Sequence, residues 1–407
     1  CSTAKIPLVA YTGLEYQLSA IQNNRAIFVL WAITGKLDAP GAIYLNAKGL
    51  ETPKLFEIPE DDKPIGVDEF PLFYKFSGLG QFSRFPKAVL EDEPYPVRGL
   101  MILGGSPVLS FPDSKSWREA YKKLDCLIVL DRYFTEDARY ADVVFPACSL
   151  FEVPKAVPGP EGSHIVEPLI EPVGESKNDV LIMGAIAKKL GFGDKLPQTE
   201  EELRSWLLSG TAPYAGDFGT SADQKKEKHY KKYETGELRA DGKPGFPTPS
   251  GKLEICSTIL AENGFVPYPE YKDVRSIPEL AGKEYPFTMT SGARSNNRMG
   301  VFGANLDKIA EIEPYPFVDI NAEDAKEIGI KDGDMVKVIT PFADGTFKAK
   351  IRGIARHAIH IPHGGGSAYM AEPWKNGNVN DLCSLDYADP MTGFVLIKSV
   401  PCRVEKV

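Results

Sequence analysis

Two short segments of the sequence end in residues that are suited to binding a phosphorylated ligand. Gly104-Gly105-Ser106-Pro107 follows the apolar segment 99–103, and Leu130-Asp131 ends the apolar segment that begins at residue 126. Glycines let backbone N–H groups approach a phosphate closely, and an Asp can accept two donors from a guanine or a ribose. Open α/β sheets bind ligands at the carboxyl ends of their strands, so both positions are candidate binding sites. The alternatives are a plain turn for the glycines and a strand-end cap for Asp131.

A second set of candidates lies in the last third of the sequence. Thr290-Ser291-Gly292-Ala293-Arg294 places small residues before an Arg, which makes a donor-rich corner suited to phosphate. A polar turn is the common alternative for such a stretch. Asn380 and Lys398 are of types that are usually solvated, and residue type alone assigns them no role.

Two histidines precede a glycine run, His360 and His363 before Gly364-Gly365-Gly366. His360 falls in an alternating, strand-like segment and His363 in its exit turn, so this spacing does not place both on one helical face. No third ligand is near in sequence, and the pattern therefore favours a glycine loop that approaches a ligand over a metal site.

The sequence contains no self-contained catalytic motif. It has no Walker loop, no G-x-G-x-x-G and no Ser–His–Asp set in a known context. None of the six cysteines forms a C-x-x-C pair, so local sequence builds neither an iron–sulfur nor a zinc site. Cys126 and Cys148 adjoin apolar segments, and we expect them to be buried thiols.

The elements that must position these residues differ between the two ends of the chain. In residues 1–195 the periodicity predicts strands at 99–103, 126–130 and 141–145. It predicts helices over 25–33, 114–123 and 179–190, the last capped by Asn178. Short apolar strands that alternate with helices indicate a doubly wound parallel sheet, which is an α/β domain.

The rest of the chain divides into two parts. Residues 196–280 are polar and weakly periodic, and we interpret them as a connector or insertion with a helix at 200–208 and a strand at 252–255. Residues 281–407 are rich in short β-branched segments, which predicts a β-barrel. Its expected strands are 287–290, 317–320, 335–339, 347–354 and 357–361, with one helix at 322–328 that Asn321 caps.

The composition is that of an ordinary globular protein. The net charge is −9, and lysines and arginines are spread along the 407 residues, so neither a nucleic-acid footprint nor a membrane-spanning segment is indicated. The sequence begins with Cys1 inside what reads as folded protein, and we expect residues upstream. The compartment stays open between periplasm and cytoplasm of a prokaryote.

In their order along the chain these motifs resemble one family. Residues 129–147 resemble the hallmark stretch D-x-F-x-T-E-T-A-x-x-A-D-V-V-L-P of the DMSO reductase (molybdopterin oxidoreductase) family. Residues 11–17 and 34–41 are similar to its preceding helix and T-G-N-x-D-x-P-G-G turn, and residues 248–254 to its T-P-S-G-K-x-E motif. Residues 321–336 resemble its dinucleotide-binding barrel. The resemblance covers nearly the whole chain.

The resemblance implies a cofactor, bis-molybdopterin guanine dinucleotide with molybdenum or tungsten. It also implies that the β-rich part is a double-psi-type barrel, and that the protein serves anaerobic respiration. Gly13 and Gln17 would approach a pterin, and Asp131 would accept from the guanine. The implied cofactor-binding residues are Gly13, Gln17, Gly104, Gly105, Ser106, Pro107, Leu130, Asp131, Asp179, Ser291, Gly292, Arg294, Arg298, Asn380 and Lys398.

Three positions depart from the family pattern. The family often has Asn where this chain has Ser106 and Arg where it has Ala293, and residues 159–164 lack the usual Asn-x-Glu-Gly-Arg pattern. These differences concern the details of binding.

The resemblance also implies that an N-terminal domain with a 4Fe-4S cluster, and the metal ligand itself, precede this region. The expected partners are the cofactor, those N-terminal domains and an iron–sulfur electron-transfer subunit. We therefore expect an oxidoreductase part that acts on a small substrate and is inactive alone. The alternatives are a part of a hydratase or hydroxyl-transferase of the same family, or a cofactor-free interaction module.

Overall fold

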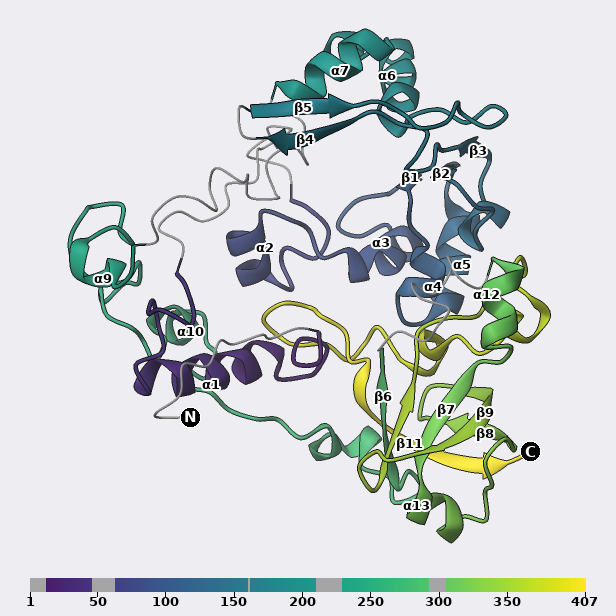
Figure 1. Ribbon diagram of the computed structural model, residues 1–407. Helices are drawn as coiled ribbons and strands as arrows, with labels where there is room; N and C mark the ends of the chain where they lie inside the picture. The colour runs from purple at the N-terminus through teal and green to yellow at the C-terminus, as the bar shows by residue number, and fades with distance from the viewer. Residues whose placement is uncertain (1–11, 46–62, 160–161, 210–228, 293–304) are drawn as a thin grey trace.

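The computed structural model describes residues 12–45, 63–159, 162–209, 229–292 and 305–407. In this part of the chain no helix is long and apolar enough to cross a membrane. The predicted fold class is confirmed: a parallel α/β sheet is followed by a closed β-barrel, which lies at the lower right of Figure 1.

The parallel sheet has the strand order β1–β2–β3, with β1 at Gly99–Leu103, β2 at Cys126–Asp131 and β3 at Val143–Pro146. All pairs are parallel, so the three carboxyl ends meet at one edge. Helix α3 (Phe85–Glu91) and helix α5 (Ser114–Lys123) pack together beside it, and α4 (Pro107–Ser110) follows β1. The predicted bounds of β1 and α5 are confirmed to the residue, because a full apolar strand and an Asp113 cap delimit them.

The core beneath this sheet is aromatic and aliphatic. Trp117 of α5 and Val129 of β2 are fully buried, and Val108 of α4 packs in the same cluster. This packing fixes the segment between β1 and α5, which contains Gly104 to Pro107.

In Figure 1, α6 and α7 lie with β4 and β5 above the sheet, whereas α1, α9 and α10 lie on the opposite side of the view. Helix α1 spans Ala20–Ile33 and begins five residues earlier than predicted; α6 spans Asp179–Lys189, and the Asn178 side chain caps it as predicted. Helix α7 (Glu200–Leu208) packs on a hairpin of β4 (Lys155–Gly159) and β5 (Gly162–Val166). The other short helices are α2 (Pro71–Ser77), α9 (Lys232–Thr235), α10 (Thr258–Glu262), η1 (Phe82–Arg84), η2 (Asp137–Arg139), η3 (Gly193–Lys195), η4 (Val274–Ser276) and η5 (Pro278–Leu280).

The predicted strand at 252–255 is wrong, because this segment has no strand. The Glu254 carboxylate accepts the backbone N–H groups of Ser250 and Thr258 instead, at 3.1 and 2.8 Å. Side chains that bond to nearby backbone compete with a strand ladder.

Six strands close the barrel in the order β10–β6–β11–β8–β9–β7. Their bounds are β6 Phe287–Ser291, β7 Phe317–Asn321, β8 Met335–Ile339, β9 Asp344–Arg352, β10 Ala358–Ile361 and β11 Lys398–Lys406. The helices are α12 (Asp307–Ile312), α13 (Ala322–Glu327), η6 (Glu372–Lys375) and η7 (Val379–Leu382). Alternate strand residues such as Met289, Val336 and Ile359 fill the interior.

The prediction that the Cys126 and Cys148 thiols are buried is wrong. Cys126 is exposed and Cys148 is half-buried, whereas Cys383 and Cys402 are the buried thiols within the described part of the chain. Cys126 is the first residue of β2 and Cys148 follows β3, so both lie at strand ends and not in the covered middle of the sheet.

Candidate functional site

The exits of β1 and β2 are joined by a hydrogen bond, since the Gly104 N–H donates to the Leu130 carbonyl over 2.9 Å. Gly104 has φ +57°, which favours glycine, and a Cβ there would meet no atom within 4 Å. At Gly105 the nearest atom to such a Cβ is Ile102 Cγ2 at 3.7 Å. The space beside this backbone is therefore open to a ligand.

Two carboxylates lie at the same edge of the sheet. Asp131 ends β2 and accepts the Tyr133 N–H at 3.0 Å, and Asp179 is the first residue of α6. Burial raises the pKa of Asp179, and the charge of the nearby Asp131 raises it further. Guanine presents N–H donors on its Watson–Crick edge, so paired acceptors of this kind suit it.

The Ser106 side chain points away from the open space. It is buried and donates to the Asp137 carboxylate, so its hydroxyl is already paired within the chain. Pro107 is also buried, at the first position of α4. A ligand in the open space would therefore contact the backbone of these two residues and not their side chains.

On the barrel side, Lys398 at the start of β11 holds the exit of β6. Its ammonium donates to the Ser291 carbonyl, and the Ser291 hydroxyl donates to the Ile397 carbonyl at 2.8 Å. Gly292 has φ +105°, and a Cβ would come within 2.4 Å of the Lys398 Nζ, so this corner requires glycine. Burial lowers the pKa of Lys398.

Both histidines of the glycine run lie beside this corner. His360 Nδ1 lies 3.0 Å from Asp319 Oδ2, and its Nε2 lies 2.9 Å from the Gly292 carbonyl oxygen. Burial lowers the pKa of His363 to about 4, and the positive charges of Lys398 and His360 contribute. Among the described residues, no three His, Cys, Asp or Glu side chains are arranged to hold a metal ion.

Asn380 connects the barrel to the sheet edge. It is buried in η7, and its Nδ2 donates to the Leu109 carbonyl of α4 over 2.7 Å. Its Oδ1 is buried with no hydrogen-bond partner in the described part of the chain. A buried carbonyl oxygen without a donor costs on the order of 1–3 kcal/mol, which a donor from outside the chain would offset.

The turn that contains Gly13 and Gln17 lies next to the barrel corner. Gln17 Nε2 donates to the Gly13 carbonyl over 2.9 Å, and the Lys398 N–H donates to the Tyr16 carbonyl over 3.2 Å. Gly13 is exposed, with open space where a Cβ would be. Arg294 and Arg298 lie outside the described residues.

The predicted residues thus fall into two groups. The sheet-edge group contains Gly104 to Pro107, Leu130, Asp131 and Asp179, and the barrel group contains Ser291, Gly292, Lys398 and the turn at Gly13 and Gln17. The Asn380–Leu109 hydrogen bond joins η7, which packs on barrel strand β9, to α4, which begins at Pro107 of the sheet-edge group.

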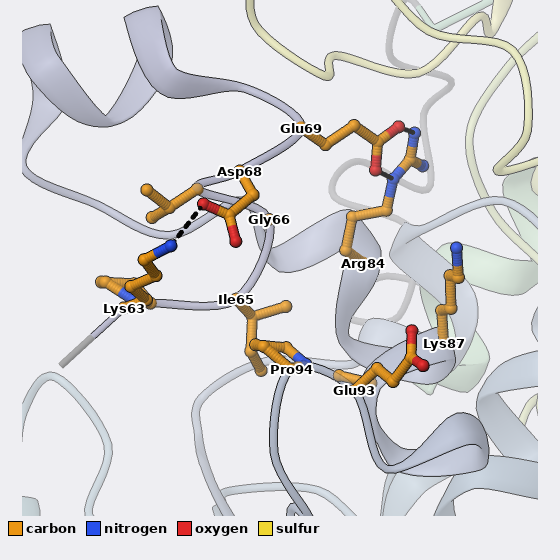
Figure 2. A pocket seen from close by; sticks show the side chains of 12 residues that line it. Lys63, Ile65, Gly66, Asp68, Glu69, Arg84, Lys87, Glu93 and Pro94 are labelled. Carbon is orange, nitrogen blue, oxygen red and sulfur yellow. Dashed lines mark hydrogen bonds and ion pairs between the residues drawn. The ribbon is translucent and has the colours of Figure 1, made fainter.

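A pocket of about 210 Å³ lies elsewhere (Figure 2). Arg84 pairs with Glu69 and Lys63 pairs with Asp68 along its wall, so these charges already neutralise one another. It contains no predicted site residue.

Two family profiles match the chain. "Molybdopterin oxidoreductase" matches residues 20–189, and "Molydopterin dinucleotide binding domain" matches residues 288–401. The chain belongs to the molybdopterin oxidoreductase family. The first match contains the sheet-edge group, and the second contains the Ser291 corner, Asn380 and Lys398.

Individual relatives agree with this family. The chain is 30% identical to the F420-dependent formate dehydrogenase subunit alpha of Methanocaldococcus jannaschii, over 67% of this chain and 39% of that protein. It is 31% identical to the probable oxidoreductase YoaE of Bacillus subtilis, over 77% of this chain and 44% of that protein. Acetylene hydratase of Syntrophotalea acetylenica is 24% identical over 89% of this chain and 54% of its own length. The chain thus spans about half the length of these relatives or less.

The fold agrees as well. The solved structure of acetylene hydratase from Pelobacter acetylenicus superposes with a TM-score of 0.65 at 21% identity, over 84% of this chain and 52% of that one. This similarity supports the arrangement of the sheet and barrel.

The residues at the site fit a molybdopterin dinucleotide. Gly104 and Gly13 leave open space beside the backbone, Asn380 Oδ1 has no donor among the residues that the structure describes, and Lys398 is a buried cation. These are the features that a long, polar, anionic ligand requires.

Sequence reasoning missed Glu136, Asp137 and Asp319, which hold site residues in place through buried side chains. Glu136 and Asp137 lie inside the hallmark stretch, but their partners are distant in sequence. The sequence offered one indication of their role, which is that two adjacent acidic residues stand inside the hallmark stretch 129–147.

Proposed function

We propose that this chain is the cofactor-holding part of a molybdenum or tungsten oxidoreductase that acts on a small substrate. The observation that carries the proposal is the Asn380–Leu109 hydrogen bond, because it joins η7, which packs on the barrel strand β9, to α4, which begins at Pro107 of the sheet-edge group. Two binding surfaces held together in this way suit a ligand with two chemically different ends.

Each group has a separate role in this proposal. Asp131 and Asp179 accept hydrogen bonds from the guanine, and the backbone of Gly104 and Gly105 borders the diphosphate. On the other side, the Lys398 ammonium offsets negative charge on the ligand. When bound, the metal and its pterins supply oxygen-atom or electron transfer, and the protein supplies placement and electrostatics.

We further propose that the chain does not turn over a substrate by itself. None of its six cysteines lies in the context of a family metal ligand or cluster motif. The partners in this proposal are N-terminal domains with a 4Fe-4S cluster and an iron–sulfur electron-transfer subunit. The formate dehydrogenase relative, itself described as a subunit alpha, supports the presence of further subunits.

A second candidate is a non-redox hydratase that uses the same cofactor. The acetylene hydratase sequence supports it, since it matches more of this chain than the formate dehydrogenase does. The two candidates share the cofactor site described above and differ in the chemistry at the metal.

Calorimetric titration of the full chain with molybdopterin guanine dinucleotide tests the proposal. We expect saturable binding that Asp131→Asn weakens about tenfold, because one charge-assisted hydrogen bond is lost. Asp68→Asn in the pocket of Figure 2 is the matched control and should leave the affinity unchanged. A wild-type chain that gives no binding heat would contradict the proposal.

A further inference from the structure

Two adjacent buried carboxylates contact two different loops of the site. Glu136 and Asp137 lie at the start of η2 and are 2% and 0% exposed. Thr135 caps the turn, since its hydroxyl accepts the Ala138 N–H over 3.2 Å. Carboxylates are rarely buried so completely without a specific set of partners.

Asp137 binds the loop at the exit of β1. One carboxylate oxygen accepts the Ser106 hydroxyl, and the other accepts the Val108 N–H at 3.1 Å and the Tyr121 hydroxyl at 2.8 Å. All three donors are uncharged, and burial raises the pKa of Asp137. Ser106 and Val108 flank the end of the Gly104–Pro107 loop, so this side chain sets where that loop lies.

Glu136 binds the loop that follows β10. Its Oε2 accepts the Ala368 N–H at 3.1 Å, two residues after the Gly364–Gly366 run. Its Oε1 lies 2.8 Å from Arg139 Nη1 and 3.8 Å from Arg118 Nε, which compensates the buried charge. The glycine run also lies close to α4, the helix that follows the 104–107 loop, because a Cβ at Gly366 would lie 3.1 Å from Leu109 Cδ2.

We propose that Glu136 and Asp137 are positioning residues that fix the two glycine loops, 104–107 and 364–366, relative to each other around the nucleotide. The idea rests on the proposed function for its ligand, but its structural part does not. Neither side chain is exposed enough to contact a ligand directly. One rigid turn therefore links a loop of the sheet to a loop of the barrel.

The role of Asp137 in positioning the 104–107 loop is tested with two variants. Each variant removes one hydrogen bond from the Asp137 carboxylate. Ser106→Ala removes the bond to the loop, and Tyr121→Phe removes the bond to α5, which carries no site residue. Amide hydrogen exchange of the full chain is measured without ligand. We expect Ser106→Ala to speed exchange at 104–108 about tenfold and Tyr121→Phe to leave it within about twofold.

The role of Glu136 in positioning the 364–366 loop is tested with a second variant and its control. Glu136→Met removes the acceptor of the Ala368 N–H, whereas Arg139→Met removes an ion pair of Glu136 and leaves that acceptor. Exchange at 364–370 should rise in the first variant alone. As a rescue, Asp137→Asn keeps an oxygen for Val108 and should recover most of the protection at 104–108 that Asp137→Ala loses.

Binding of GDP, as the probe for the nucleotide end, completes the test. Ser106→Ala and Glu136→Met should raise the dissociation constant about tenfold, and the two control variants should not change it. If each variant and its control change exchange and affinity alike, the carboxylates only stabilise the fold and the inference is overturned. If the wild-type chain does not bind GDP, the proposed function is in question, and the exchange data still decide the positioning role.

Discussion

Lys398 shows how single residues of the site are kept at a cost to the fold. It is 8% exposed, donates to the Ser291 carbonyl and makes no salt bridge within the described residues. Burial lowers its pKa, which means that the charged form is disfavoured where it stands. A buried cation of this kind is expected where an anionic ligand binds.

Lys398→Met should therefore separate binding from stability. We expect the free energy of unfolding to stay within about 1 kcal/mol of wild type, because an apolar isostere removes the desolvation penalty along with the hydrogen bond. Cofactor affinity should fall at least about tenfold. Urea unfolding and calorimetric titration measure the two quantities. A large loss of stability with unchanged affinity would show that Lys398 is a structural residue.

His363 predicts a dependence of stability on pH. Its pKa is lowered from 6.5 to about 4 by burial and by the charges of Lys398 and His360. The unfolded chain therefore takes up a proton at a higher pH than the folded chain does. The free energy of unfolding that depends on neutral His363 is therefore fully present above pH 6.5. It is lost as the pH falls toward 4.

The expected loss is about 3 kcal/mol at most between these two pH values, since one pKa unit corresponds to about 1.4 kcal/mol. Urea unfolding of wild type and His363→Asn at a series of pH values isolates this residue from the other titrating groups. The difference between the two proteins should change over this window. A difference that is constant from pH 7 to pH 4 would contradict the prediction.

At the residue scale, the sequence predicted that Asp131 ends its strand, but it did not predict the direction of the Ser106 side chain. The Ser106 hydroxyl turns inward to Asp137, 31 positions along the chain. No local pattern contains such a contact, because packing of α5 and η2 creates it.

At the scale of elements, the two glycines at strand exits are needed for different reasons. Gly104 adopts φ +57° in open space, whereas Gly292 at φ +105° also lies against Lys398. The first leaves room for a ligand, and the second allows a close contact within the chain.

Gly104→Ala should weaken binding beyond its effect on the fold. Gly78, the cap residue of α2, has φ +68° and equally open surroundings, so Gly78→Ala is the matched control. Both variants should lose about 1–2 kcal/mol of stability, because L-residues disfavour this conformation. Only Gly104→Ala should raise the dissociation constant of the cofactor, as measured by titration. Equal affinities for the two variants would mean that the loop does not border the ligand.

The elements themselves were predictable where hydrophobic patterning was continuous. Strands β1 and β8 and helices α5 and α7 agree with the predicted bounds. Strand β11 was missed because Pro401 and a bulge at Ser399, with φ +64°, interrupt its pattern.

At the scale of the whole molecule, residues 21 and 81 contact the segment near residue 390. The Asp389 carboxylate accepts the Ile21 N–H over 3.3 Å, and Gln81 Nε2 donates to the Thr392 carbonyl. The barrel segment near residue 390 is thus tied to helices from the first hundred residues. Contacts over such sequence separations cannot be predicted from local periodicity, and the domain boundaries at 195 and 280 stay a prediction.

The central claim is that the sheet edge and the barrel hold one kind of cofactor together. Amide hydrogen exchange of the full chain, with and without molybdopterin guanine dinucleotide, tests it most directly. We predict slower exchange on binding at both 102–110 and 378–383, with residues 63–69 of the pocket in Figure 2 unchanged. Protection at only one of the two segments, or at neither, would contradict the account.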